Sequence, residues 1–242
     1  MSADPAANLV GLLERIAVAV EDIAPRPVFE IAPGEAMTDP VCQELVWAYL
    51  LWEADDKRAR ALAGKMCESF VDLNEFRVCL PSELASFFGS SYPKAAERGD
   101  RMRATLNDIY NREHSVSLES LGAMNKRDAR AYLDSLEGIP PYVAARTFLI
   151  GLGGHAFPLD ERLMGVLAAE EALAETDAGD LVTASTWLER QVRSGDAAPA
   201  LHALEAYAAK PASSRPKRKS VTKKTPKKAG SSKKHSRKSS KS

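Results

Sequence analysis

The sequence predicts an all-α body followed by a disordered basic tail. Apolar residues recur with a helical period through most of the first 209 residues, as in the stripe formed by Leu9, Leu12, Leu13, Ile16 and Val20. No stretch alternates apolar and polar residues over the length of a strand with turn residues at both ends. From residue 211 onward, Lys, Ser and Pro dominate, and such a segment buries too little apolar surface to offset the entropy of ordering.

The stripe places the first helix at about residues 6–22. A connector rich in Pro and Gly, residues 24–40, leads to a second helix through 41–52 and a third over 56–70. Asn125 and Asp160 precede apolar periodic segments and are expected to be N-caps. Further helices are expected at 81–88, 93–112, 126–136, 142–152, 161–173, 179–194 and 197–209.

Composition narrows the class of protein. A chain of 242 residues with 45% hydrophobic content is typical of a soluble globular protein. The longest apolar runs, such as Leu45–Trp52, are far shorter than the roughly 20 residues that cross a bilayer. The first ten residues carry acid where a signal peptide carries base. We therefore expect a cytoplasmic, nucleoid-associated protein without a membrane partner, nuclear if the source is eukaryotic.

Three cysteines, Cys42, Cys67 and Cys79, have the spacing of neither a zinc nor an iron–sulfur site. We expect buried reduced thiols and no iron–sulfur cofactor, since no cysteine follows Cys79.

Charge is divided unevenly along the chain. Of the 33 Lys and Arg residues, 13 follow Lys210, where no Asp or Glu occurs, so residues 1–210 carry 20 basic against 33 acidic residues. Because Lys and Arg supply most non-specific affinity for phosphate, the tail is expected to tether DNA. Two alternatives are a nuclear import signal and a tail that folds back on the acidic body. The expected DNA contacts in the tail are Lys217, Arg218, Lys219, Lys223, Lys224, Lys227 and Lys228.

A short motif links two of the expected helices. Glu137–Pro141 forms a tight turn in which Gly138 can take a left-handed conformation, and Pro141 suits the first turn of the following helix. Asp160 follows at the start of a later helix. A role as a helix cap and a role in catalysis explain an aspartate at this position equally well.

This arrangement resembles the helix-hairpin-helix DNA glycosylases of the endonuclease III type (the HhH-GPD superfamily). Leu136–Ala144 match the hairpin of that family, and Leu159 and Asp160 match the pair that opens its catalytic helix. The likeness extends over about residues 38–209 and is specific only from 126 to 167. It implies a two-lobed helical domain at 38–209, with an N-terminal helix and connector at 1–37 packed on it and the tail at 210–242.

The resemblance also implies roles for individual residues. The hairpin would hold a phosphate of double-stranded DNA, and Asp160 would stabilise positive charge on the sugar, or prime water, while a flipped base departs. A monovalent cation held by hairpin carbonyls is also implied. The hairpin positions expected to contact DNA are Gly138, Ile139, Pro140, Tyr142 and Val143.

The sequence departs from the family at several of these positions. Tyr142 stands where relatives with lyase activity have a lysine, and a phenol cannot form an imine. Lys94 and Lys126 are the lysines that could replace it. Pro140 and Pro141 lack amide hydrogens, which weakens the phosphate grip.

Two acidic residues are further departures. Glu161 places a second carboxylate beside Asp160. Glu53 stands where relatives have a glutamine that fills the gap left by the flipped base, so Glu53 and Tyr142 are candidates for the base pocket.

Three hypotheses follow. The first is a monomeric, monofunctional DNA glycosylase that removes a damaged or mismatched base through Asp160. The second is a catalytically degenerate DNA-binding protein that retains the fold and the tail, and the third is a helical scaffold whose tail binds an acidic protein. A catalytic Asp160 should line an open cleft near the hairpin amides, whereas a buried cap favours the other two hypotheses.

Overall fold

The computed structural model describes residues 4–17, 30–32, 35–36, 39–174, 179–211, 213 and 215. The described chain is helical apart from one small antiparallel pair of strands, β1 (Glu30–Ala32) and β2 (Glu35–Ala36). This confirms the all-α class. At three and two residues, the strands are too short to show an alternating pattern, so the sequence did not predict them.

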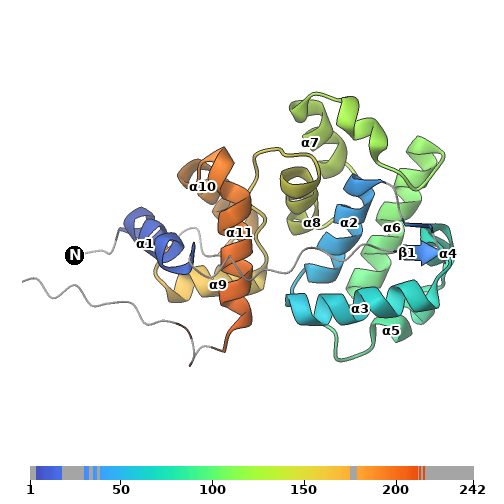
Figure 1. The fold of residues 1–242 in the computed structure, drawn as a ribbon, viewed down its shortest axis with the longest axis horizontal. Helices are drawn as coiled ribbons and strands as arrows, with labels where there is room; N and C mark the ends of the chain where they lie inside the picture. The colour runs from blue at the N-terminus through green and yellow to red at the C-terminus, as the bar shows by residue number, and fades with distance from the viewer. Residues whose placement is uncertain are drawn as a thin grey trace, which may run out of the picture.

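The helices form two lobes, seen side by side in Figure 1. One lobe is built on α2 (Pro40–Leu51), a helix in which every residue after Pro40 is buried, because α3, α8 and the segment after α8 all pack against it. The other helices of this lobe are α3 (Asp56–Ser69), α4 (Leu73–Val78), α5 (Pro81–Phe88), α6 (Ala95–Glu113), the 3-10 turn η1 (Glu119–Ala123), α7 (Lys126–Asp134) and α8 (Pro141–Arg146).

The second lobe joins the two ends of the described chain. Its helices are α1 (Pro5–Ala17), α9 (Glu161–Ala169), α10 (Leu181–Gln191) and α11 (Ser194–Ala209). α1 packs against α11, and the Asn8 side chain donates a hydrogen bond to the Glu171 carbonyl at 2.8 Å. Residues 18–22 of the expected first helix lie outside the described residues.

Most helix boundaries agree with the sequence pattern, and the exceptions have local causes. The expected helix 142–152 is an α-helix only to Arg146 and continues as a π-helical turn, Thr147–Gly151. The helix expected over 161–173 ends at Ala169. The expected caps are confirmed, because the Asn125 and Asp160 side chains accept hydrogen bonds from the backbone at Asp128 and Leu163.

Two expectations from composition can be checked on the same residues. No helix in the described part of the chain is both long and apolar enough to cross a membrane. The three cysteines form no disulfide, and Cys42 is buried while Cys67 and Cys79 are only half-buried, unlike the fully buried thiols that we expected.

Candidate functional site

The hairpin between α7 and α8 has the tight form that the sequence predicts. Gly138 has φ +75°, and a Cβ there would lie 3.0 Å from the Arg101 carbonyl oxygen and 3.1 Å from the Ala104 Cβ, so α6 leaves no room for a side chain. Tyr142 and Val143 lie in the first turn of α8, where amides have no helical acceptor, but both residues are buried, at 1% and 0% exposed. The Ile139 amide instead donates to the Leu136 carbonyl at 3.3 Å, so it is not an available donor for phosphate.

The hairpin carbonyls do not suit a bound cation. The Gly138 carbonyl accepts a hydrogen bond from the Arg101 guanidinium at 3.3 Å, and the Glu137 carbonyl accepts one from the Thr105 hydroxyl at 2.7 Å. The Arg101 guanidinium already supplies positive charge at the turn, which repels a metal ion there. The reaction proposed for this protein uses no cation at the hairpin.

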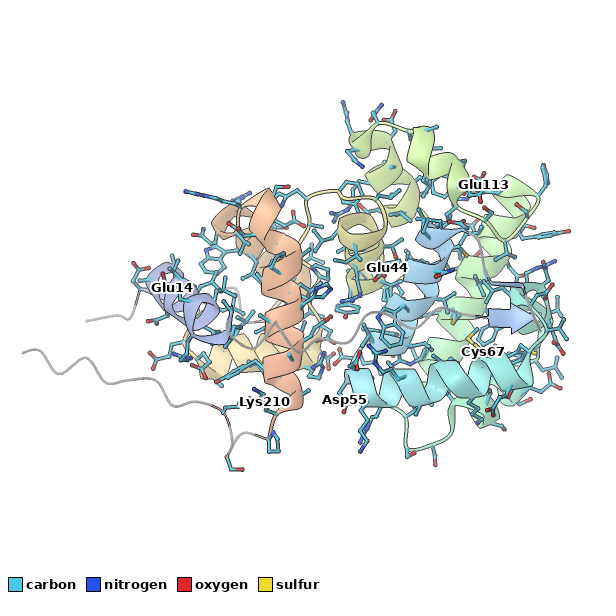
Figure 2. The ribbon with its side chains drawn as sticks, in the orientation of Figure 1. Glu14, Glu44, Asp55, Cys67, Glu113 and Lys210 are labelled. Carbon is cyan, nitrogen blue, oxygen red and sulfur yellow. The ribbon has the colours of Figure 1, made fainter. Side chains whose placement is uncertain are left out.

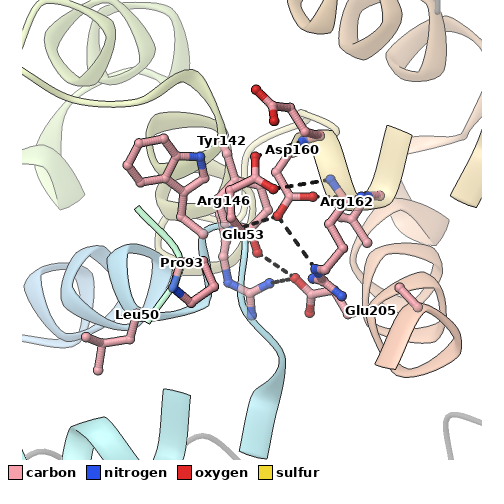
Figure 3. Close-up of polar contacts among 12 residues, drawn as sticks. Leu50, Glu53, Pro93, Tyr142, Arg146, Asp160, Arg162 and Glu205 are labelled. Carbon is pink, nitrogen blue, oxygen red and sulfur yellow. Dashed lines mark hydrogen bonds and ion pairs between the residues drawn. The ribbon is translucent and has the colours of Figure 1, made fainter. Parts of the chain in front are cut away.

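Asp160 lies at the N-terminus of α9, where the two lobes meet (Figure 3). One carboxylate oxygen accepts a hydrogen bond from the Leu163 amide at 2.8 Å, and the other accepts one from the Glu53 amide at 2.9 Å. Its side chain is 0% exposed. Burial raises the pKa of Asp160 above its ordinary value of 3.8, against the opposing effects of Arg162 and these two amides. In this conformation the carboxylate is closed off, not open to a cleft.

Glu53 closes the site from the other lobe. It has φ +57°, which turns the chain sharply between α2 and α3, and its carboxylate accepts hydrogen bonds from the amides of Glu161 (2.9 Å) and Arg162 (3.2 Å). Glu53 and α9 therefore cap each other, since the Glu53 amide in turn binds Asp160. Burial and the nearby Asp160 raise the pKa of Glu53 above its ordinary value.

A buried arginine fixes the backbone that leads into this corner. The Arg98 guanidinium donates hydrogen bonds to the carbonyls of Tyr49, Trp52 and Pro93. Burial lowers the pKa of Arg98 to about 10, so it stays charged at neutral pH. Arg98 thus holds the C-terminal carbonyls of α2 directly before Glu53.

Tyr142 belongs to a buried ionic network between the lobes. Its hydroxyl donates to Glu205 of α11 at 2.7 Å, and Arg146 donates to Glu205 and, at 2.9 Å, to Glu44 of α2 (Figure 3). Glu44 lies between the α2 and α8 ribbons in the middle of the molecule (Figure 2). Burial, followed by the charge of Glu205, raises the pKa of Tyr142 well above 10. The phenol is therefore a neutral hydrogen-bond donor and is no nucleophile at neutral pH.

A pocket of about 720 Å³ opens between α2, α3 and α11, beside this network. In Figure 2, Asp55 at the start of α3 and Lys210 at the end of α11 mark the two lobes that border it. Its size lies within the roughly 300–1,000 Å³ of small-molecule sites. Two residues link the pocket to the site: Arg162 lies near Asp160, and Glu205 accepts the hydrogen bond of Tyr142. Glu53, Tyr142 and Asp160 themselves are not on the pocket wall.

The sequence did not single out Glu44, Arg146 or Glu205, and it marked Arg162 only as a departure from the family, with no role. Glu44 and Arg146 had a detectable pattern, because each is a charged residue inside an otherwise apolar helical segment, and buried charges require partners. Arg162 and Glu205 gave no such indication, because their helices carry other charges. The lysine and arginine positions expected to bind DNA in the tail, from 217 to 228, lie outside the described residues.

Both lysines that could take the place of the family's catalytic lysine, which is Tyr142 here, already contact other groups. Lys94 Nζ lies 3.4 Å from the Glu161 carboxylate, and Lys126 Nζ donates to the Leu152 carbonyl. Within the described ranges, no group of three or more His, Cys, Asp or Glu side chains is arranged to hold a metal ion.

Of the comparisons with known proteins, the one with solved structures identifies the fold. No family model and no curated protein sequence matches the chain. Among solved structures, a thermostable thymine-DNA glycosylase matches with a TM-score of 0.55 and 14% identity, over 84% of this chain and 87% of that one. A trapped endonuclease III–DNA covalent intermediate and a non-covalent endonuclease III–DNA complex each match with a TM-score of 0.60 and 11% identity, over 84% of this chain and 85% of theirs. The chain therefore has the fold of the helix-hairpin-helix DNA glycosylases.

Proposed function

We propose that this protein is a monofunctional base-excision DNA glycosylase that binds duplex DNA and hydrolyses the N-glycosidic bond of a damaged or mismatched base. The observation that carries the proposal is the fold shared with a thymine-DNA glycosylase and with DNA-bound endonuclease III, in which Asp160 lies between the lobes and its neighbour Arg162 lines a pocket of about 720 Å³. The likeness to a thymine-DNA glycosylase and to DNA-bound endonuclease III supports DNA as the partner.

The chemistry needs little beyond one ionised carboxylate. The hairpin between α7 and α8 holds a backbone phosphate, and the target base enters the pocket. As the bond from the sugar to the base breaks, Asp160 stabilises the positive charge that develops on the sugar ring. Water then adds to the anomeric carbon and loses a proton, and the departing base takes up a proton, so the products are an abasic sugar and the free base.

DNA must open the site before this reaction. Asp160 is sealed by the Glu53 corner, so entry of a nucleotide requires Glu53 to leave the amides of Glu161 and Arg162. The Asp160 carboxylate then loses one of its two amide partners and faces the sugar.

A lyase step is not part of the proposal. The Tyr142 hydroxyl is tied to Glu205, and a phenol has no nitrogen to form an imine with the opened sugar. The reaction also needs no iron–sulfur cluster, which agrees with the absence of any cysteine after Cys79.

The test uses full-length protein and labelled duplexes that carry uracil or thymine opposite guanine, an oxidised base or an alkylated base. Hot alkali then converts abasic sites into strand breaks. We expect breaks at one or more lesions only after alkali, and none in the matched undamaged duplex. Breaks without alkali, or a covalent adduct trapped by borohydride, would contradict the absence of a lyase step.

One observation favours a second function, a DNA-binding protein that no longer excises bases. Asp160 is 0% exposed, and both of its carboxylate oxygens accept hydrogen bonds from backbone amides. If the protein binds every duplex and yields no alkali-labile site in any of them, the second function replaces the first.

A further inference from the structure

Arg162 differs from the other arginines of the pocket in its lack of partners. Arg146 is bound by Glu44 and Glu205, and Arg60 by Asp56 at 2.6 Å. The Arg162 side chain is four-fifths buried, yet its three guanidinium nitrogens have no hydrogen-bond acceptor among the described residues.

The carboxylate nearest to Arg162 does not satisfy it. Arg162 Nε lies 3.8 Å from Asp160, a distance at which the two charges attract each other but no hydrogen bond forms. Buried donors without acceptors are costly, and an arginine presents five N–H groups in a fixed fork. The wall of the pocket therefore offers unused donors next to the carboxylate assigned to the reaction.

The remaining charges of the pocket do not change this balance. Burial and Arg146 lower the pKa of His202 below 6.5, so this imidazole is neutral at pH 7. Glu44 and Glu205 are held by Arg146 and Asp56 by Arg60, while Asp55 lies 3.9 Å from the Arg58 guanidinium. Lys57, also on the wall, is an exposed cation. The unsatisfied group in the pocket is thus a cation that donates hydrogen bonds.

We propose that Arg162 is the specificity-determining residue, and that it selects uncharged bases with carbonyl oxygens on the edge that enters the pocket. Pyrimidine-2,4-diones and oxidised bases have such oxygens. N-alkylated purines that carry a positive charge are excluded, because Arg162 repels them. This inference rests on the proposed function, since it assumes that a flipped base occupies the pocket.

The experiment measures binding apart from catalysis. Duplexes carry 2′-fluoroarabino analogues of uridine or 7-methylguanosine, whose electron-withdrawing fluorine slows hydrolysis, and a matched undamaged duplex is the reference. Wild-type protein is compared with Arg162→Gln. The matched control is Arg58→Gln, which removes the same charge from an exposed side chain that does not line the pocket.

We expect wild-type protein to prefer the uracil duplex over the other two. Arg162→Gln should bind the uracil duplex about tenfold to a hundredfold more weakly, because it loses a hydrogen bond from a charged donor. It should bind the undamaged duplex as wild type does. Arg58→Gln should keep the preference. Arg162→Lys should still reject the cationic base while it loses part of the preference for uracil, because it keeps the charge without the fork.

Other outcomes overturn the inference. If Arg162→Gln weakens binding to all three duplexes equally, Arg162 contacts a phosphate and not a base. If wild-type protein prefers the 7-methylguanine duplex, the assignment of base class is wrong. Failure of the proposed function looks different, because a protein that excises nothing can still show the Arg162-dependent preference in this assay.

Discussion

Replacement of Arg146 by methionine is expected to destabilise the whole protein. Arg146 joins the lobes, because it lies at the end of α8 and binds Glu44 of α2 and Glu205 of α11. Glu44 is 1% exposed and Arg146 is 3% exposed. Methionine keeps much of the side-chain volume, so the change removes charge and hydrogen bonds without a large cavity.

The expected magnitude follows from the carboxylate left behind. Removal of one partner of a buried ion pair costs about 3–5 kcal/mol, because the other charge stays buried and uncompensated. In a domain of this size each kcal/mol lowers the melting temperature by roughly 2–4 °C. We therefore expect Arg146→Met to melt roughly 6–20 °C below wild type.

Thermal unfolding followed by circular dichroism measures this shift. A double variant, Glu44→Gln with Arg146→Met, neutralises the more deeply buried of the two stranded carboxylates and should recover a substantial part of the loss. A shift of less than about 2 °C for the single variant would contradict a buried, energetically important pair. A double variant that is no more stable than the single one would contradict the explanation by a stranded charge.

Three further predictions concern the hairpin, the site and the tail. Gly138→Ala should lower the free energy of unfolding in urea by about 1–3 kcal/mol. The loss should exceed that of Gly153→Ala, because Gly153 has a similar φ of +62° but open space around it. Equal losses would contradict the close approach of Gly138 to α6. The single-turnover excision rate should rise with pH through a value above 3.8, because the ionised form of Asp160 acts and burial raises its pKa; a rate that stays flat down to pH 4 would contradict this. Truncation after Lys210 should flatten the dependence of log affinity on log salt by about 0.9 for each DNA phosphate that the tail neutralises in the full-length protein, and an unchanged slope would exclude the tail from binding.

Local patterns in the sequence predict most of the fold. The apolar stripe of α1 and the caps at Asn125 and Asp160 follow from neighbouring residues alone, and the structure agrees with each. α4 was missed, because six residues complete fewer than two turns and show no clear period. The π-helical turn after Arg146 was missed as well, since its residues continue the apolar pattern of α8.

The site could be predicted only in part. The resemblance of the hairpin points to Gly138 and Asp160 as expected site residues, but the closure of Asp160 depends on Glu53, which lies 107 residues earlier in the chain. Glu53 was expected to face the DNA gap, and no local pattern indicates that its carboxylate caps α9. Contacts of this kind are set by how the lobes pack, and a single sequence carries no record of them.

Single-turnover excision by Asp160→Asn tests the central claim most directly. Asparagine keeps the cap on α9 but removes the charge assigned to the sugar, so we expect excision about 100- to 1,000-fold slower than wild type, with unchanged affinity for undamaged duplex. Glu161→Gln, the exposed neighbour, is the control and should stay within about threefold of wild type on the same scale. If Asp160→Asn excises as fast as Glu161→Gln, Asp160 is only a helix cap and the proposed excision site is wrong.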